Sequence, residues 1–217
     1  GRRGMSETTP MRRGVPIVIS SPSGGGKTTL CHRLIARLEG VAASVSYTTR
    51  PRRAHERDGV HYHFVTAAQF DALVAEDALL EWAYVHGHRY GTGRSVTEQR
   101  LAAGQDVLFD IDVQGGRQLA ARLNGLVLVF VLPPSMATLE ARLRGRGSDS
   151  EPQVAKRLQA ARKEIEAARG LYTYWIVNDE LERATHDLVA IVEAARLGSI
   201  NVEALLARVL GDASGFE

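Results

Sequence analysis

The stretch Val15–Thr29, with the sequence VPIVISSPSGGGKTT, decides the fold of this chain. Its first part, Val15–Ser20, is an almost continuous apolar run, which is typical of a strand buried on both faces of a parallel sheet. Three consecutive glycines follow and lead into the helical pattern of Thr28–Leu38. This order of strand, glycine-rich turn and helix predicts a loop whose backbone N–H groups curl around phosphate oxygens at a helix N-terminus.

The side chains of this loop suit nucleotide phosphates and a magnesium ion. Lys27 would reach the β- and γ-phosphates, and the Thr28 hydroxyl can hold Mg²⁺. Ser21 stands where the motif usually begins with glycine, so the matching tail is Gly26-Lys27-Thr28. A glycine-rich turn without a ligand is the alternative, but the flanking strand and helix favour phosphate binding. The residues predicted to bind ATP here are Ser21, Pro22, Ser23, Gly24, Gly25, Gly26, Lys27, Thr28 and Thr29.

Three further apolar runs read as buried strands, Val107–Val113, Leu126–Leu132 and Tyr174–Val177. Helical patterns separate them, and this alternation predicts an α/β fold whose parallel core sheet is flanked by helices. Two carboxylates, Asp110 and Asp112, end the first of these runs and should share one face of the strand. Carboxylates at this edge of a sheet suit Mg²⁺ or its hydration shell, so we expect Asp110 to contact the metal through water.

Composition excludes several classes of protein. The chain has 217 residues, 44% of them apolar, with a net charge of +2, which is ordinary for a globular protein. Four arginines and one glutamate give the segment 1–14 a charge of +3, so the rest of the chain carries −1. A folded body of this charge does not predict nucleic-acid binding. The single cysteine, Cys31, excludes a disulfide scaffold and suits a reducing compartment, so we expect a cytoplasmic protein.

No apolar run approaches the roughly 20 residues that a membrane helix needs, so we expect no membrane span. Residues rich in tyrosine, threonine, histidine and arginine interrupt the strand–helix alternation and predict an inserted α+β lobe. An arginine-dense helical segment further on predicts a mobile lid. The expected division is a flexible arm at 1–14, a core at 15–46, 98–135 and 170–217, the lobe at 47–97 and the lid at 136–169.

The last helical pattern covers 199–210, with Ser199 as its expected N-cap. Its apolar face is expected to pack on its own domain. A contact in a homo-oligomer is the alternative, and the sequence leaves the oligomeric state open.

At this point the sequence resembles the guanylate kinases. The matching blocks follow the order of that family between about residues 15 and 197. They are Ser21–Thr28, Ser46–Arg50 with Arg53, Glu56, Gly59 and Tyr62, Glu81–Ala83, Tyr90–Thr92, Asp110–Gly115, Arg142–Gly147 and Val177–Asp179. The resemblance implies phosphate transfer from ATP to GMP in the presence of Mg²⁺, giving ADP and GDP.

The resemblance also implies which residues bind GMP. Glu81 would accept hydrogen bonds from N1–H and N2–H₂ of guanine, whereas adenine would leave this carboxylate unpaired, a difference worth about 10⁴-fold or more. Ser46 and Thr92 would supply hydroxyl donors to the base. Planar guanidinium groups suit the phosphate of GMP. The implied GMP-binding residues are Ser46, Arg50, Arg53, Tyr62, Glu81, Tyr90, Thr92, Asp110 and Asp112.

Charge neutralisation during transfer would come from Lys27, Mg²⁺ and arginines of the lid. The family match selects Arg146, Arg157 and then Arg142 from a segment that is rich in arginine. Closing the lid would bring them to the triphosphate and expel water. Asn178 would lie near the adenine of ATP.

The chain departs from the family pattern in the loop of the inserted lobe. Arg52 and His55 stand where the family usually has proline and glycine, so the resemblance leaves open whether Arg52 or Arg53 contacts the GMP phosphate.

Two other functions remain open at this stage. A related small-molecule kinase acting on a ribose phosphate would keep the loop but need not keep Glu81, Ser46 and Asp112 together. A non-catalytic protein-binding module would have no use for Lys27 or for the lid arginines. Five histidines between 55 and 88 also contain two H-x-H pairs, for which solvated side chains are a better interpretation than a metal site.

Overall fold

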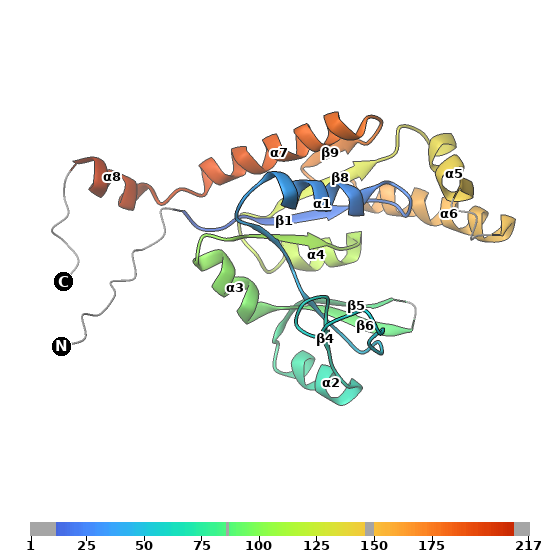
Figure 1. The fold of residues 1–217 in the computed structure, drawn as a ribbon, viewed down its shortest axis with the longest axis horizontal. Helices are drawn as coiled ribbons and strands as arrows, with labels where there is room; N and C mark the ends of the chain where they lie inside the picture. The colour runs from blue at the N-terminus through green and yellow to red at the C-terminus, as the bar shows by residue number, and fades with distance from the viewer. Residues whose placement is uncertain (1–11, 86, 146–149, 211–217) are drawn as a thin grey trace.

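A five-stranded sheet forms the centre of the molecule, for which a computed structural model describes residues 12–85, 87–145 and 150–210 (Figure 1). The strand order is β2-β7-β1-β8-β9, and every pairing is parallel. The strands are β1 (Pro16–Ser20), β2 (Val41–Ala43), β7 (Asp106–Asp110), β8 (Val127–Leu132) and β9 (Tyr174–Val177). The predicted α/β fold with a parallel core sheet is confirmed, and β2 is a short edge strand that the apolar pattern did not reveal.

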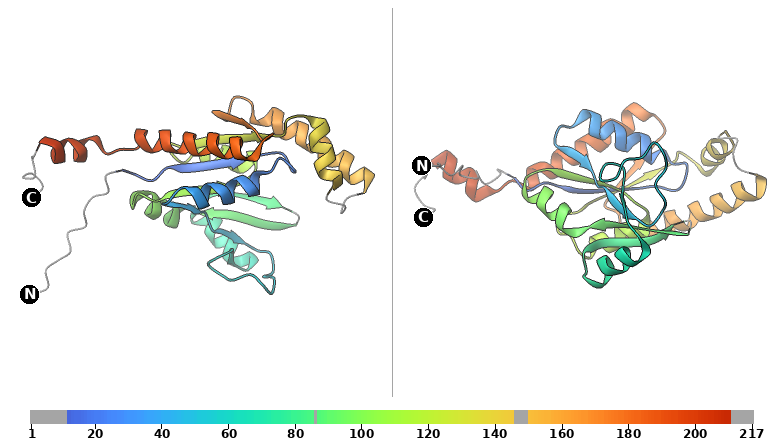
Figure 2. Two further views of the ribbon diagram at one scale, coloured as in Figure 1. Left: turned by 45° about the horizontal axis from the view of Figure 1, so that its top comes forward. Right: turned by 60° about the horizontal axis from the view of Figure 1, so that its bottom comes forward.

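Alternate residues of β1 enter two different hydrophobic cores, which explains why the whole strand is apolar. Ile17 and Ile19 pack on one face of the sheet with side chains of α1 (Lys27–Arg37) and α7 (Leu181–Gly198). Val18 packs on the other face with α3 (Arg94–Ala102) and α4 (Val113–Ala120). Figures 1 and 2 show these helices covering the two faces of the sheet.

A smaller four-stranded sheet projects from the core with the order β4-β3-β6-β5. Its elements are β3 (Ser46–Thr48), β4 (His63–Phe64), α2 (Ala67–Ala75), β5 (Leu79–Val85) and β6 (His88–Gly93). Helix α2 begins with a capping box in which Thr66 and Gln69 exchange side-chain and backbone hydrogen bonds. The described elements between 46 and 93 therefore have the α+β character expected for the inserted lobe.

Two helices, α5 (Met136–Gly145) and α6 (Glu151–Ala168), lie beyond the carboxyl ends of the core strands, at the right of Figure 1. They share a small core of Leu139, Leu143, Val154 and Ala161. Arg146, one of the predicted lid arginines, lies outside the described residues. Among the described residues, no helix combines the length and the apolar character that a membrane span requires.

The C-terminal helix differs from the sequence-based expectation. Helix α8 spans Val202–Leu210 and is capped by Asn201, whose side chain accepts the N–H of Ala204 at 3.1 Å. Ser199 instead donates its hydroxyl hydrogen to Arg196 O at the end of α7. All residues of α8 are described and none is buried, and the helix extends away from the body (Figures 1 and 2). The expectation that this helix packs on its own domain is therefore wrong.

A buried carboxylate ties the start of β1 to the end of α7. The side chain of Asp106 is fully buried, and its Oδ1 accepts the N–H of Val15 at 2.8 Å. Arg12 lies 2.5 Å from the same oxygen, and Nε of Arg196 lies 2.7 Å from Oδ2. Two guanidinium groups and one backbone N–H therefore compensate the desolvation of this carboxylate.

We expect Asp106→Asn to lower the free energy of unfolding by about 3 kcal/mol, because one partly buried guanidinium would face an amide donor in place of an acceptor. Urea unfolding followed by circular dichroism measures the change. Asp71→Asn is the matched control, since Asp71 is 69% exposed in its pair with Arg89 and should cost less than about 1 kcal/mol. Equal effects of the two substitutions would contradict the structural role of Asp106.

Candidate active site

The glycine-rich loop between β1 and α1 has the backbone conformation that its sequence predicts. Gly24 and Gly26 have φ values of 95° and 93°, a region that residues with a side chain rarely adopt. The N–H of Gly25 donates to Pro22 O at 2.9 Å and closes the turn. A Cβ added at Gly26 would lie 2.2 Å from Nδ2 of Asn178, so this position has no room for a side chain.

Asn178 supports the loop from behind. Its side chain is buried, and its Nδ2 donates to Gly25 O at 2.9 Å. Its backbone N–H donates to Leu132 O at 2.8 Å, which fixes the residue at the end of β9 beside β8. Asn178 is not among the residues that line the cavity beside this loop, which is described next, so its contact with adenine stays a prediction. Its contact with Gly25 is direct.

A cavity of about 360 Å³ lies against the loop. Its lining contains most of the residues that the sequence predicts for ATP and one that the sequence analysis did not select, Glu164 of α6. The lining residues are Ser21, Pro22, Ser23, Gly24, Gly26, Lys27, Thr28, Thr29 and Glu164. The loop and Glu164 of α6 therefore border one space, whose volume is in the range of small-molecule sites.

Lys27 is the first residue of α1 and lies between two acceptors. Its Nζ is 2.5 Å from Oδ1 of Asp110 and 3.2 Å from Ile111 O. Strand β7 ends at Asp110, earlier than the predicted Val107–Val113 strand, and the Asp110 side chain is 42% exposed. The parallel pairing of Ile19 with Asp110 brings the loop after β1 and the carboxylate after β7 to the same edge of the sheet.

A second cavity, of about 480 Å³, meets the first at Lys27 and Glu164. It lies between the core sheet and the smaller sheet, and six of the predicted GMP-binding residues line it. The lining residues are Lys27, Ser46, Tyr62, Glu81, Ala83, Val85, Tyr90, Asp110, Ile111, Asp112 and Glu164. Residues as far apart in the sequence as Lys27 and Glu164 are therefore gathered around one space.

Glu81 is a buried carboxylate on β5. Burial is the main reason why its pKa is raised to about 7, and the negative charge of Asp112 contributes in the same direction. The Thr92 hydroxyl donates to its Oε1 at 2.7 Å, which fixes the carboxylate across the β5–β6 pair. The Thr92 hydroxyl is buried against Glu81, and its direct contact with the base stays a prediction.

Asp112 does not share a strand with Asp110, as the sequence suggested, because it is the N-cap of α4. Its Oδ1 accepts the N–H of Gly115 at 2.8 Å. The cap holds the carboxylate at the rim of the second cavity beside Glu81, where it can accept a further donor.

Arg50 contacts Tyr62 and Tyr90, two residues that line the second cavity, but it is not itself among the lining residues. Its Nη2 is 2.6 Å from Oε1 of Glu56, and this guanidinium lowers the pKa of Glu56 to about 2. The guanidinium carbon is 5.3 Å from the ring centre of Tyr62, and Tyr90 contributes a side-chain hydrogen bond. Arg50, Tyr62 and Tyr90 therefore form one cluster, and its guanidinium and phenol groups have the chemistry to bind a phosphate.

The neighbouring arginines contact the backbone around Glu56. Nη1 of Arg52 donates to Glu56 O at 2.9 Å, and the backbone N–H of Arg53 donates to Oε2 of Glu56 at 2.8 Å. Neither side chain lines the second cavity as the described residues define it. The assignment of Arg53 to the GMP phosphate stays a prediction, and the choice between Arg52 and Arg53 remains open.

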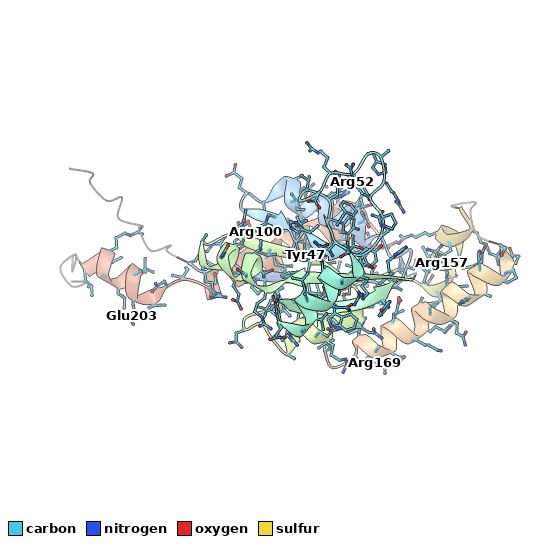
Figure 3. The ribbon with its side chains drawn as sticks, turned by 90° about the horizontal axis from the view of Figure 1, so that it is seen from below. Tyr47, Arg52, Arg100, Arg157, Arg169 and Glu203 are labelled. Atoms are coloured by element: carbon cyan, nitrogen blue, oxygen red, sulfur yellow. The ribbon has the colours of Figure 1, made fainter. Side chains whose placement is uncertain are left out.

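Two of the predicted lid arginines contact the loop region. Nη2 of Arg157 donates to Ser23 Oγ at 2.6 Å, and Nη2 of Arg142 donates to Asn178 O at 2.9 Å. Figure 3 shows Arg157 on α6 at one end of the molecule, opposite Glu203 on α8. Helix α6 is therefore bonded to the loop at Ser23, and helix α5 is bonded to Asn178, which supports the loop.

The residues at the junction of the cavities suit Mg²⁺ in chemical type. Hydroxyl and carboxylate oxygens of Thr28, Asp110, Asp112 and Glu164 border the two spaces, and Mg²⁺ prefers such hard oxygen ligands. Within the described residues, no group of three or more His, Cys, Asp or Glu side chains forms a cage that could hold a metal alone. This set fits an ion that keeps water molecules and shares its coordination with substrate phosphates.

Glu164 is the residue that sequence reasoning missed. Nothing in the composition of α6 separates it from the neighbouring Glu166. Its spacing from Arg157 was the available signal, because residues seven apart lie on the same face of a helix.

The fold and this junction define a class of protein. A glycine-rich phosphate loop follows the central parallel strand β1. The cavity at this loop meets a second, substrate-sized cavity at Lys27 and at Glu164 of the lid. This arrangement is that of the nucleoside monophosphate kinases with a phosphate-binding loop.

Comparison with known proteins gives the family. The family model described as guanylate kinase matches residues 13–195. A guanylate kinase from Anaeromyxobacter dehalogenans is 53% identical over 185 residues, which is 85% of this chain and 82% of that protein. One from Neisseria gonorrhoeae is 49% identical over 86% of this chain and 90% of that protein. The crystal structure of guanylate kinase from Anaplasma phagocytophilum is similar with a TM-score of 0.70 and 31% identity, covering 90% of this chain and 95% of that one. The chain belongs to the guanylate kinase family.

We expect Asn178→Ala to destabilise the chain by about 1–3 kcal/mol, because Gly25 O would lose its buried donor. The free energy of unfolding in urea measures this effect. Asn124→Ala, in an exposed turn, is the matched control and should change stability by less than about 0.5 kcal/mol. An Asn178→Ala variant as stable as this control would contradict the supporting role of Asn178.

Proposed function

We propose that this chain transfers the γ-phosphoryl group of ATP to GMP, giving ADP and GDP. The observation that supports this most strongly is the meeting of two cavities at Lys27, one lined by the phosphate loop and the other by Glu81 and Asp112. Transfer between two bound nucleotides requires such adjacency, because an oxygen of the acceptor phosphate must approach the γ-phosphorus in line with the leaving oxygen.

Guanine is recognised in this proposal by buried acceptors. Glu81 accepts hydrogen bonds from N1–H and N2–H₂, while the Thr92 hydroxyl holds its carboxylate in position at 2.7 Å. Asp112 takes a further N–H of the base, and the Ser46 hydroxyl donates to the opposite edge. Adenine has an acceptor at N1 and would leave the Glu81 carboxylate without a donor, so AMP is rejected.

The phosphate of GMP is bound by the cluster of Arg50, Tyr62 and Tyr90, with Arg53 as the further candidate. A guanidinium group binds phosphate through paired charge-assisted hydrogen bonds. The pairing of Arg50 with Glu56 at 2.6 Å holds the guanidinium beside Tyr62 and Tyr90, which line the cavity. This cluster therefore orients the acceptor phosphate towards Lys27.

Lys27, Arg142, Arg146 and Arg157 bear the charge of the triphosphate in this proposal. The phosphate oxygen of GMP attacks the γ-phosphorus while the bond to the β–γ bridging oxygen breaks, and ADP leaves. The attacking oxygen is already anionic, so no general base is needed. Thr28 would hold Mg²⁺ directly, and Asp110 through water; when bound, the ion neutralises charge on the β- and γ-phosphates. Asn178 contributes here by holding Gly25.

The division into a core, a GMP lobe at 47–97 and a lid at 136–169 also belongs to this proposal, with both parts closing on the nucleotides. The binding partners are then the small molecules ATP and GMP. A cytoplasmic location accords with the single buried thiol of Cys31.

Production of ADP from ATP and Mg²⁺ tests the function when GMP, AMP, CMP, UMP, a ribose phosphate and no acceptor are compared side by side. We expect turnover with GMP alone. Turnover with the ribose phosphate would favour the related small-molecule kinase. A folded chain that binds GMP without turnover would contradict the proposal and favour a protein-binding module.

Glu81 should make GMP binding depend on pH. Its pKa of about 7 means that the free protein holds a proton there at lower pH, whereas guanine binds the charged carboxylate. GMP affinity should therefore fall as pH decreases below 7, approaching about tenfold per unit well below that pKa. Calorimetric titration with GMP from about pH 5.5 to about pH 8.5, a range that brackets the pKa of Glu81, measures this dependence.

Glu81→Gln provides the control for this pH dependence. The phosphate of GMP also titrates near pH 6, but it does so in both proteins, so the ratio of wild-type to variant affinity isolates Glu81. The variant should bind GMP about a hundredfold more weakly at high pH, since charged hydrogen bonds are lost. A ratio that does not change with pH would show that Glu81 is not the guanine acceptor.

A further inference from the structure

One carboxylate oxygen at the junction of the two cavities has no hydrogen-bond partner. Within residues 12–85, 87–145 and 150–210, Oε2 of Glu164 is the one buried side-chain nitrogen or oxygen atom without a partner. A buried polar atom without a partner is costly, and in a native structure it indicates a donor that arrives with a ligand, an ion or water.

The position of Glu164 is shared by both substrate spaces. Glu164 and Lys27 are the two residues that line both the cavity at the phosphate loop and the cavity at Glu81. In the proposed function, the transferred phosphoryl group crosses between these spaces. The Glu164 carboxylate therefore lies beside the path of that group, on the side of the lid.

The contacts of α6 fix this carboxylate relative to the loop. The backbone N–H of Ser23 and the positive charge of Lys27 both favour the charged form of the Glu164 carboxylate and so act to lower its pKa. Arg157, two helical turns earlier on the same face, donates to Ser23 Oγ at 2.6 Å. Helix α6 therefore contacts the loop through Arg157, and the same face of the helix places the Glu164 carboxylate where the two cavities meet.

A carboxylate in this place needs a cationic partner when nucleotides bind. The phosphates would repel the Glu164 carboxylate. Burial raises the pKa of Glu164, and the negative charge of Asp112 raises it further. Lys27 is engaged with Asp110 at 2.5 Å, so it offers limited compensation. Hydrated Mg²⁺ keeps several water molecules when it binds nucleotides, and these waters are strong hydrogen-bond donors.

We propose that Glu164 is a positioning residue for the metal, whose Oε2 accepts a hydrogen bond from a water molecule in the hydration shell of nucleotide-bound Mg²⁺. This inference rests on the proposed function. It assigns to the lid a contact with the metal in addition to its arginine contacts with phosphate. Closure of the lid would then depend on the metal as well as on the triphosphate charge.

The experiment measures binding of the β,γ-imido analogue of ATP, with Mg²⁺ and without it in EDTA, by calorimetry on the full chain. We expect Glu164→Gln to weaken binding of the magnesium complex by about tenfold, as is usual for residues that act on a metal through a ligand. Binding of the metal-free analogue should stay equal or become tighter, because a negative charge facing the phosphates is removed.

Glu166→Gln is the matched control, because it makes the same change on the same helix at a side chain that is 65% exposed. It should leave both affinities unchanged. Glu164→Ala is the second variant and should show the same selective loss if the carboxylate, and not the volume of the side chain, is responsible. Circular dichroism and the unfolding midpoint establish that both Glu164 variants are folded.

The magnesium-selective loss supports the proposal. Wild-type affinity of Glu164→Gln for the magnesium complex would overturn it, as would an equal loss with and without the metal, which is the result expected of a purely structural residue. The acceptor comparison above is independent of this measurement. Failure of the wild-type chain to phosphorylate GMP would reject the proposed function. The effect of Glu164→Gln on analogue binding with and without Mg²⁺ would still decide whether Glu164 acts through the metal.

Discussion

The parallel pairing of β1 with β7 is the constraint on which the rest of the structure depends. Because Ile19 lies opposite Asp110, the glycine-rich loop that follows β1 and the carboxylate that ends β7 meet at one edge of the sheet. The ion pair of Lys27 with Asp110 forms across this junction at 2.5 Å. The apolar core residues of both strands thereby determine where the charged groups lie, and the site needs little additional organisation.

The second cavity depends on this junction and on the smaller sheet. Pairing of β5 with β6 places Thr92 beside Glu81, and the N-cap of α4 places Asp112 at the same rim. Burial then gives the Glu81 carboxyl its pKa of about 7, which prepares it for a ligand that supplies hydrogen-bond donors. In the proposed function, the same low-dielectric surroundings of Glu81 make a base without matching donors costly to bind, so one feature supplies both affinity and selectivity.

Much of the core could be predicted because its strands are apolar on both faces, as in Leu126–Leu132, and its loop carries three adjacent glycines. Short elements gave weaker signals. Strand β2 has three residues at the sheet edge, and β7 ends before Asp112 because that side chain caps α4. The unpacked α8 has the same amphipathic pattern as a packed helix, since periodicity does not say what covers a face. Contacts between distant segments, such as Asn178 with Gly25 or Arg157 with Ser23, depend on tertiary structure.

In the proposed function, two nucleotide sites meet at Lys27, and phosphate passes directly between them. Calorimetric titration with adenosine and guanosine joined 5′ to 5′ through five phosphates tests it most directly. We predict that one such molecule binds per chain and displaces both an ATP analogue and GMP. It should bind more tightly than either nucleotide, because the two linked ligands share one binding event. Binding of two such molecules per chain, or displacement of only one of the two nucleotides, would contradict it.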